Sequence, residues 1–229
     1  MRAIYLPEIF TLKSVQLDEE KCHHFKNVLK VKDGEEILLL DGRGLRAQGA
    51  LVFVGKKKLR IDLSGEVTQG IPPEDITVVV GQTKKDAQDL VIKNLCELGV
   101  TKIIITHSQF AQRYKINKER VKKQLISALE QSNNLFLPDF EMKKLDEIDW
   151  DSFTHTYILS TEEKSHSPIP PLTAGCAIVV GPEGGFGAED YQIFKAMTHA
   201  SFLNIKSPIL RTPNAVSCAV GYLWGVRDA

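Results

Sequence analysis

A glycine-rich loop that follows an apolar run is the feature that most constrains the fold of this chain. The run Ala177–Val180 leads directly into the loop Gly181–Gly187. In α/β folds, ligands lie just outside the carboxyl ends of strands, and glycines there permit positive φ and close approach of the backbone to a ligand. A second loop, Ser207–Asn214, leads into the apolar segment Ala215–Trp224. The two loops together predict a ligand site.

Downstream of residue 75, strand-like and helix-like segments alternate. The strand-like segments are Ile76–Val80, Lys102–Thr106, Tyr157–Leu159, Ala177–Val180 and Phe202–Ile205. The helix-like segments are Lys85–Leu98, Lys118–Gln131, Ala188–Met197 and a last helix from Pro213. This alternation is typical of an α/β fold with a mostly parallel sheet covered by helices.

Local signals predict where several of these helices begin and end. Gly99 is a C-terminal stop, and Asn117 is suited to cap the helix that follows it. Thr212 followed by Pro213 predicts a helix start, with Thr212 as the N-cap. One face of the segment Lys118–Gln131 is apolar and predicts a core-facing helix; it carries Val121, Leu125, Ala128 and Leu129.

The first part of the chain is β-rich. The segment Glu35–Leu40 ends at the turn Asp41–Gly44, and Asp-Gly is a strong hairpin signal. Strands are expected at Leu45–Val54 and Leu59–Leu63, with a short helix at Glu19–Leu29 before them. Short strands at close spacing favour a small barrel, and residues 70–75 are a plausible linker. We therefore expect a β-barrel domain over residues 1–70 and an α/β domain over residues 74–229.

The composition excludes several classes of protein. Lys+Arg 29 and Asp+Glu 29 give a net charge of zero, so any polyanion site must be local. The chain has neither a G-x-S-x-G elbow nor a G-x-G-x-x-G loop, which argues against a hydrolase of that type and a nicotinamide-dependent enzyme. None of the six histidines has the spacing of a metal site, so no metal is expected.

The four cysteines indicate a reducing compartment. Cys22, Cys96, Cys176 and Cys218 form no C-x-x-C pair, a pattern that suits free thiols in a cytosol. No run reaches the roughly 18 apolar residues that a membrane span needs, and the first residues lack the apolar core of a signal peptide. We expect a cytoplasmic protein with no membrane partner.

The chain has two clusters of basic residues although its net charge is zero. One holds Lys115, Lys118, Arg120, Lys122 and Lys123, and the other is Lys56–Lys58 on a predicted hairpin tip. Such runs are often solvated faces. Beside a β-barrel module they also suit contact with the phosphate backbone of RNA, and both interpretations stay open.

Several motifs, in this order along nearly the whole chain, resemble one family. The loops Gly181–Phe186 and Ile209–Thr212 resemble the signature loops of SPOUT-class, knotted RNA methyltransferases, most closely the RsmE type. The segment His23–Lys30 looks like the first motif of that family and Asp41–Gly44 like its next. Two later motifs are also present, at Glu97–Val100 and Glu130–Ser132.

The resemblance implies a PUA/OB-like β-barrel that binds RNA, followed by an α/β domain whose end is threaded into a trefoil knot. It further implies a homodimer that binds S-adenosylmethionine and methylates N3 of a uridine in 16S ribosomal RNA of the small ribosomal subunit. The cofactor-binding residues it implies are Leu159, Ser160, Thr161, Gly181, Glu183, Gly184, Gly185, Ile205, Leu210, Thr212 and Ala215. The implied RNA-binding residues are His24, Lys26, Lys30, Arg43 and Arg113.

Arg211 is the expected catalytic residue. Uridine N3 must lose a proton before it accepts a methyl group, and a guanidinium stays charged and can bridge carbonyl oxygens. A structural ion pair is the alternative for Arg211. Glu183 is the nearest carboxylate in the sequence, and a role in bracing the loop suits it as well as that of a general base.

The chain departs from the family pattern at several positions. The family usually has Arg at Lys30, Gly-Arg at Asn133 and Asn134, Gly near Lys206 and Glu at Pro213. Two alternatives follow: a catalytically weak RNA-binding or ribosome-assembly protein of the same fold, or a related knotted enzyme that methylates a ribose 2′-hydroxyl or transfer RNA.

The last helix favours a dimer or a deeply buried core element. Between Asn214 and Gly225 it carries a wide apolar surface for a terminal helix. The residues of that surface are Val216, Ala219, Val220, Leu223 and Trp224.

Overall fold

The structure is a computed structural model that describes residues 1–7, 14–17, 19–28, 30–55, 58–162 and 169–227. It divides into two compact units. The first comprises Met1–Pro72 with Leu129–Leu137, and the second comprises Pro73–Ala128 with Pro138–Ala229. Residues 129–137 thus group with the first unit although they follow a long stretch of the second.

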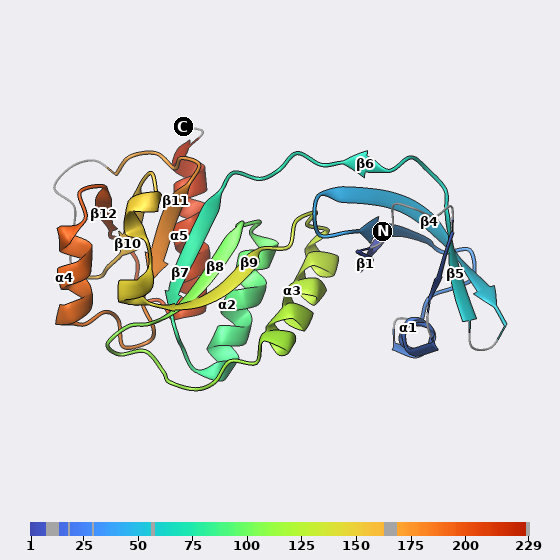
Figure 1. Ribbon diagram of the computed structural model, residues 1–229, viewed down its shortest axis with the longest axis horizontal. Helices are drawn as coiled ribbons and strands as arrows, with labels where there is room; N and C mark the ends of the chain where they lie inside the picture. The colour runs from blue at the N-terminus through green and yellow to red at the C-terminus, as the bar shows by residue number, and fades with distance from the viewer. Residues whose placement is uncertain (8–13, 18, 29, 56–57, 163–168, 228–229) are drawn as a thin grey trace. The chain divides into compact units, whose positions relative to one another are not determined.

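The first unit is built on one mixed sheet (Figure 1). Its path is β1-β3-β4-β5-β2, and β6 pairs with β4. The strands are β1 (Arg2–Tyr5), β2 (Ser14–Leu17), β3 (Glu36–Leu40), β4 (Leu45–Val54), β5 (Lys58–Leu63) and β6 (Thr68–Gln69). The short helix expected at residues 19–29 is α1 (Glu19–His23) followed by a π-helical turn, η2 (His24–Val28).

The turn between β3 and β4 confirms the hairpin that Asp41-Gly42 predicts. The Asp41 side chain is buried, and its Oδ1 accepts the N–H groups of Arg43 and Leu45 at 2.7 and 2.8 Å. Gly42 and Gly44 have φ of 72° and 105°, values that favour glycine. The strands on either side of this turn, β3 and β4, pair antiparallel with each other.

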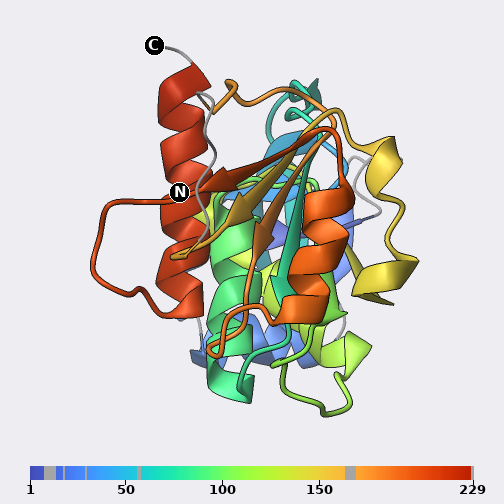
Figure 2. The same cartoon turned by 90° about the vertical axis from the view of Figure 1, so that its left-hand side faces the viewer.

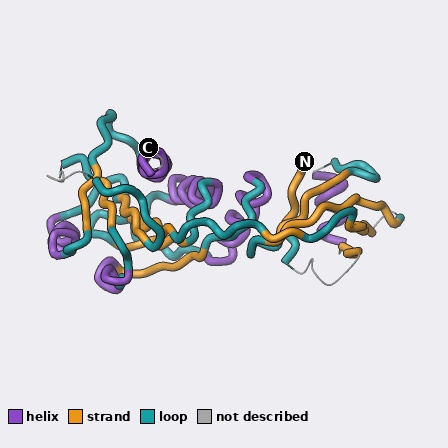
Figure 3. The backbone as a smooth tube through the Cα atoms, turned by 90° about the horizontal axis from the view of Figure 1, so that it is seen from above, coloured by secondary structure: helices purple, strands orange, loops and turns teal. Residues whose placement is uncertain are grey.

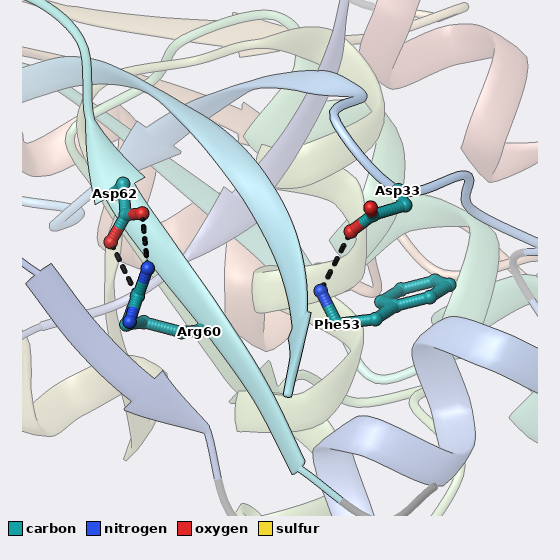
Figure 4. A network of polar contacts seen from close by, with 4 residues as sticks. All are labelled: Asp33, Phe53, Arg60 and Asp62. Atoms are coloured by element: carbon teal, nitrogen blue, oxygen red, sulfur yellow. Dashed lines mark hydrogen bonds and ion pairs between the residues drawn. The ribbon is translucent and has the colours of Figure 1, made fainter. Parts of the chain in front are cut away.

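Charged side chains form hydrogen bonds on the solvent-exposed side of the β4–β5 hairpin (Figure 4). The guanidinium of Arg60 donates two hydrogen bonds to the Asp62 carboxylate, at 2.6 and 2.8 Å. The Asp33 carboxylate accepts the Phe53 N–H at 2.8 Å. The opposite side of the unit is apolar, with Ile37, Leu39, Leu51, Leu59 and Ile61 fully buried.

The second unit is an α/β structure with an all-parallel sheet in the order β12-β10-β11-β7-β8-β9. Its strands are β7 (Ile76–Gly81), β8 (Lys102–His107), β9 (Asp139–Lys144), β10 (Thr156–Leu159), β11 (Cys176–Val180) and β12 (Ala200–Leu203). Its helices are α2 (Lys85–Glu97), α4 (Ala188–Ala196), α5 (Thr212–Arg227) and α3 (Lys118–Ser132), whose last residues, 129–132, group with the first unit. Two short 3₁₀ turns, η3 (Leu145–Glu147) and η4 (Trp150–Ser152), complete it. The mostly parallel sheet expected from the alternation is confirmed.

Helices cover both faces of this sheet (Figures 2 and 3). Helices α2 and α5 pack against each other on one face, and α4 lies on the other (Figure 2). On the α4 side, Val79, Ile104, Ile158 and Val179 form one cluster with Phe194 of α4 and Trp150 of η4. The central strands are buried on both faces, which explains why they are continuous apolar runs rather than alternating ones.

Most predicted helix ends agree with the structure. Gly99 follows α2 with φ of 73°, and the Asn117 side chain accepts the Arg120 N–H at 3.1 Å as a cap of α3. The prediction for Thr212 is wrong by one residue: α5 already includes it, and the Arg211 carbonyl accepts the Ala215 N–H at 2.9 Å. The Thr212 hydroxyl instead donates to the Gly181 carbonyl at 3.1 Å.

Strand β9 was not expected, because its sequence Asp-Phe-Glu-Met-Lys-Lys is polar and lacks the β-branched residues of a typical strand. It lies at an edge of the sheet, where only one neighbour pairs with it. The expected strand Phe202–Ile205 is shifted, since β12 ends at Leu203.

Asn133 ends helix α3 with a conformation that usually belongs to glycine. Its φ is 56°, and the next N–H, that of Asn134, reaches back to the Leu129 carbonyl at 3.2 Å. This is the hydrogen-bond pattern of a glycine C-cap, and asparagine is the residue that best replaces glycine there. The departure from the family pattern at Asn133 therefore preserves the local backbone.

Candidate ligand-binding site

A cavity of about 370 Å³ opens in the second unit where the strands β10 and β11 end. Three segments form it: residues 159–162 after β10, residues 180–186 after β11, and residues 209–215 at the start of α5. Carboxyl ends of parallel strands meet at the same edge of a sheet, which is where α/β folds bind ligands. Its volume is within the range of small-molecule sites.

The wall after β10 is held by hydrogen bonds to its main chain. Asn204 donates through Nδ2 to the carbonyls of Ser160 and Thr161, at 2.9 and 3.3 Å. The Ser160 hydroxyl shares a 2.9 Å hydrogen bond with the Tyr191 hydroxyl of α4 and accepts the Glu162 N–H at 3.2 Å. These contacts preorganise the segment before any ligand arrives.

The wall after β11 needs its glycines for different reasons. Gly185 has φ of 71° and donates its N–H to the Pro182 carbonyl at 2.9 Å, and nothing lies within 4 Å of where a Cβ would point. Gly184 lies against a side chain, since a Cβ there would be 2.9 Å from the Cβ of Phe110. The loop is thus tight on one side and open at Gly185.

The third wall places Arg211 at the cavity. Thr212 ties the start of α5 to the glycine loop through its bond to the Gly181 carbonyl. The Arg211 side chain is exposed and lines the cavity, and no carboxylate of the described residues lies within ion-pair distance of it. The structural ion pair considered for Arg211 therefore has no partner in this part of the chain.

The charged groups of the cavity are two carboxylates and one guanidinium. Glu162, Glu183 and Arg211 are its ionisable lining residues besides Tyr191. One Glu183 oxygen accepts the Lys84 N–H at 3.1 Å, just before α2 begins. Glu183 therefore braces the glycine loop against another element.

The structure brings the predicted cofactor residues together at this cavity, with one exception. Ile205 does not line it; this residue follows β12, and its carbonyl accepts the Ser207 N–H at 2.8 Å. Pro182, Phe186 and Ile209, which lie in the expected loops, also line the cavity; sequence reasoning missed Glu162, Val180 and Tyr191. Tyr191 could have been found from its place in the first turn of the helix that follows the glycine loop.

The residues expected to bind RNA belong to both units, with Lys26, Lys30 and Arg43 in the first and Arg113 in the second. The Lys26 ammonium donates to the Gly55 carbonyl at 3.0 Å and lies 4.6 Å from the centre of the Phe53 ring. Arg43, Lys30 and Arg113 are exposed. The His24 side chain and residues Lys56 and Lys57 lie outside what the structure describes.

Two buried cysteines have strongly raised pKa values. Burial raises the pKa of Cys96 to about 12 and that of Cys176 to about 11, so both thiols are protonated at neutral pH. None of the four cysteines, all of which lie in the described ranges, forms a disulfide. Within the described ranges, no group of three or more His, Cys, Asp or Glu side chains is placed to hold a metal, and no helix is long and apolar enough to cross a membrane.

The fold and the cavity define an α/β protein that binds a small ligand at the carboxyl edge of a parallel sheet, joined to a separate β unit. Residues 71–224 match the model of the RNA methyltransferase domain, and residues 17–64 match that of the RNA methyltransferase PUA domain. The chain belongs to the RNA methyltransferase family that these models describe.

Relatives cover almost the whole chain. Ribosomal RNA small subunit methyltransferase E of Rickettsia conorii is 27% identical over 209 residues, which are 88% of this chain and 85% of that protein. The enzyme of the same name from Neisseria gonorrhoeae, solved bound to S-adenosyl methionine, is 26% identical; the match covers 99% of this chain and 98% of that one, with a TM-score of 0.82. A Legionella pneumophila methyltransferase shares the fold, with a TM-score of 0.82 at 24% identity over 98% of this chain and 97% of that one.

Proposed function

We propose that this protein transfers the methyl group of S-adenosylmethionine to N3 of a uridine in the 16S RNA of the small ribosomal subunit. The observation that carries the proposal is the three-loop cavity after β10 and β11, in a chain of the RNA methyltransferase family. The match of residues 17–64 to a PUA domain supports RNA as the substrate. A ribosomal substrate and four cysteines that form no disulfide among the described residues support a cytoplasmic location.

The cavity suits S-adenosylmethionine in shape and charge. Its apolar lining offers surfaces for an adenine ring; these residues are Leu159, Val180, Phe186, Ile209, Leu210 and Ala215. The ligand carries sulfonium and ammonium cations, and the cavity offers the carboxylates of Glu162 and Glu183. Opposite charges favour binding. The open side of Gly185 leaves room for a ligand beside the loop backbone.

Bound there, the cofactor supplies a methyl group on a positively charged sulfur. The loops hold that group still, and alignment with the acceptor is a large part of what lowers the barrier of an in-line displacement. Uracil gains negative charge on its oxygens as N3 gives up its proton to water. The Arg211 guanidinium, permanently charged and unpaired among the described residues, stabilises that charge.

A homodimer and the trefoil knot belong to the same proposal. The wide apolar surface expected on the last helix is largely core, since Val216, Ala219, Val220 and Leu223 are fully buried within the chain. The support for a dimer comes instead from exposed apolar side chains on the two packed helices, Leu90 of α2 and Tyr222 of α5. The packing of α5 on α2 and β11, with Thr212 tied to Gly181, supports the threaded C-terminal segment.

Methyl transfer from labelled S-adenosylmethionine to small-subunit RNA tests the proposal directly. Nucleoside mass spectrometry of 16S RNA from cells with and without the gene should show N3-methyluridine lost at one position. The substrate is tested both as free RNA and as the assembled subunit. A protein that binds the cofactor yet transfers no methyl group to either substrate would instead be a non-catalytic RNA-binding protein of this fold.

A further inference from the structure

A second cavity, of about 560 Å³, lies in the same unit and is larger than the first. It is formed by residues 84–92 at the start of α2, residues 112–117 before α3, and the first two turns of α3. The two cavities share no lining residue. They are neighbours in structure, because the Lys84 N–H at this cavity donates to the Glu183 carboxylate at the first.

The electrostatics of this second cavity favour an anion. Lys84, Lys85 and Lys115 line it, all exposed and without a carboxylate partner among the residues that the structure describes. Arg120 also lines it but is paired with Asp89. The N-termini of two long helices, α2 and α3, add the positive ends of their dipoles.

Two glutamine side chains with buried, unpartnered amide atoms supply an independent sign of a ligand. Gln88 is 2% exposed; its Oε1 accepts the Thr83 N–H at 3.2 Å, whereas its Nε2 donor has no hydrogen-bond partner among the described residues. Gln124 Oε1 is likewise buried without a partner in that part of the chain. Buried polar groups are nearly always satisfied. Both residues line the cavity, so a rotation of each side chain would present one free donor and one free acceptor, which the edge of a nucleobase would satisfy.

The loop that closes the cavity is fixed in place. Gln82, fully buried at the end of β7, donates to the Tyr114 carbonyl at 2.9 Å and accepts the Gln112 N–H through its own carbonyl at 2.8 Å. His107 shares a 2.7 Å hydrogen bond with the Gln82 side chain. Burial raises the pKa of Tyr114, so its hydroxyl remains a donor at neutral pH.

We propose that this cavity binds one nucleotide of the RNA strand next to the methylated uridine, with its phosphate at Lys85 and Lys115 and its base against Gln88 and Gln124. The inference rests on the proposed function for the identity of the ligand. The methylated uridine itself must reach the methyl donor, and the two cavities are separately lined, so this one takes a flanking nucleotide. It thereby fixes the register of the strand and contributes to the choice of site.

Binding of uridine 5′-monophosphate tests this without any methyl transfer. In the Lys85→Ala/Lys115→Ala variant the Kd measured by NMR titration should rise about tenfold, since two charged contacts are lost. Lys93→Ala is the control, an exposed lysine two turns further along α2 that does not line the cavity, and it should bind like the wild type. An unchanged Kd in the double variant would overturn the proposal.

The base contact has its own readout. The side-chain amide resonance of Gln88 should move when uridine 5′-monophosphate is added, and inorganic phosphate alone should bind more weakly than the nucleotide. Gln88→Glu keeps the acceptor for the Thr83 N–H but removes the donor, so it should lose the advantage of the nucleotide over phosphate. Equal affinity for nucleotide and phosphate in the wild type would refute the base contact.

Methyl transfer separates this proposal from the proposed function. With 16S RNA as substrate, Lys85→Ala/Lys115→Ala should raise KM and leave cofactor affinity unchanged, because its residues lie outside the first cavity. If the wild type methylates no RNA but still binds the nucleotide through these lysines, the proposed function fails and the nucleotide site stands. If methylation proceeds with an unchanged KM in the variant, the nucleotide site fails and the proposed function stands.

Discussion

Arg211 is the residue whose substitution tests the proposed chemistry most directly. Arg211→Ala should lower turnover about a hundredfold, as removal of a preorganised charge stabiliser does. Arg211→Lys keeps a charge but loses the planar fork that can reach two oxygens, and should also lose much of the activity. Cofactor affinity, measured by calorimetry, should change far less than kcat, because the charge is needed only in the transition state.

The same pair of measurements separates the alternatives for Arg211. Thermal unfolding of the variant shows whether the fold persists. A loss of cofactor binding equal to the loss of turnover would make Arg211 a binding residue, and wild-type turnover in Arg211→Ala would leave it without a role.

His155 sets a pH dependence of stability. Burial, assisted by the neighbouring His199, lowers its pKa below the ordinary value of 6.5, and its Nε2 is 3.0 Å from the Ser201 hydroxyl. Just below pH 6.5 the unfolded chain therefore binds more protons at this residue than the folded one, so the free energy of unfolding should fall as the pH falls. Urea unfolding between pH 7 and 5 measures the slope, and His155→Gln should reduce it. An identical slope in the variant would contradict this prediction.

At the scale of elements, the glycine loop after β11 carries the cofactor proposal. Gly185→Val places a β-branched residue at φ of 71°, a conformation such residues rarely adopt. Affinity for S-adenosylmethionine should drop at least about tenfold while the sheet stays folded. Calorimetry of the folded variant measures this affinity. Gly55→Val is the control, because Gly55 also has a positive φ, of 77°, but lies in a turn of the first unit. Wild-type affinity in Gly185→Val would count against the site.

The elements that the sequence predicts well are those whose signals are local. The buried strands β7, β8 and β11 are continuous apolar runs, and the cap at Asn117 and the stop at Gly99 depend on neighbours within a few residues. Strand β9 is polar and owes its place to pairing with β8, a contact between residues distant in the chain. No pattern within the β9 sequence itself predicts that β8 will pair with it.

In the candidate site, too, the sequence predicts the features with local signals and not those that depend on long-range contacts. Its glycine loop and the turn before α5 are recognisable because special backbone conformations demand special residues. Tyr191 and Phe186 line the cavity because α4 packs back over the sheet, and Gln88 matters because its amide is buried. Those facts depend on tertiary packing. The sequence predicts the basic cluster beside the second cavity, but it does not predict the cavity itself.

At the scale of the whole molecule, self-association is the first property to measure. We expect a dimer at micromolar concentration in sedimentation equilibrium. Leu90 and Tyr222 are 53% and 45% exposed on the packed helices α2 and α5, and their burial against a partner would remove apolar surface from water. Leu90→Glu/Tyr222→Glu should shift the protein to a monomer, whereas Ile71→Glu, a 91% exposed residue outside these helices, should not. A wild-type monomer would reject the dimer.

RNA binding should depend on both units. Lys118, Lys122 and Lys123 are exposed on α3, and the other basic cluster, Lys56–Lys58, is in the first unit. Each lysine that touches a phosphate releases a counterion, so the slope of log K against log salt should become shallower by about 2 when three such lysines of either cluster are changed to Ala. Filter binding of a 16S RNA fragment at several salt concentrations measures the slope.

Cofactor affinity should be unchanged in both variants, because neither cluster lines the first cavity. A cluster whose removal leaves the slope unchanged is a solvated face, and RNA contact would then rest on the other unit.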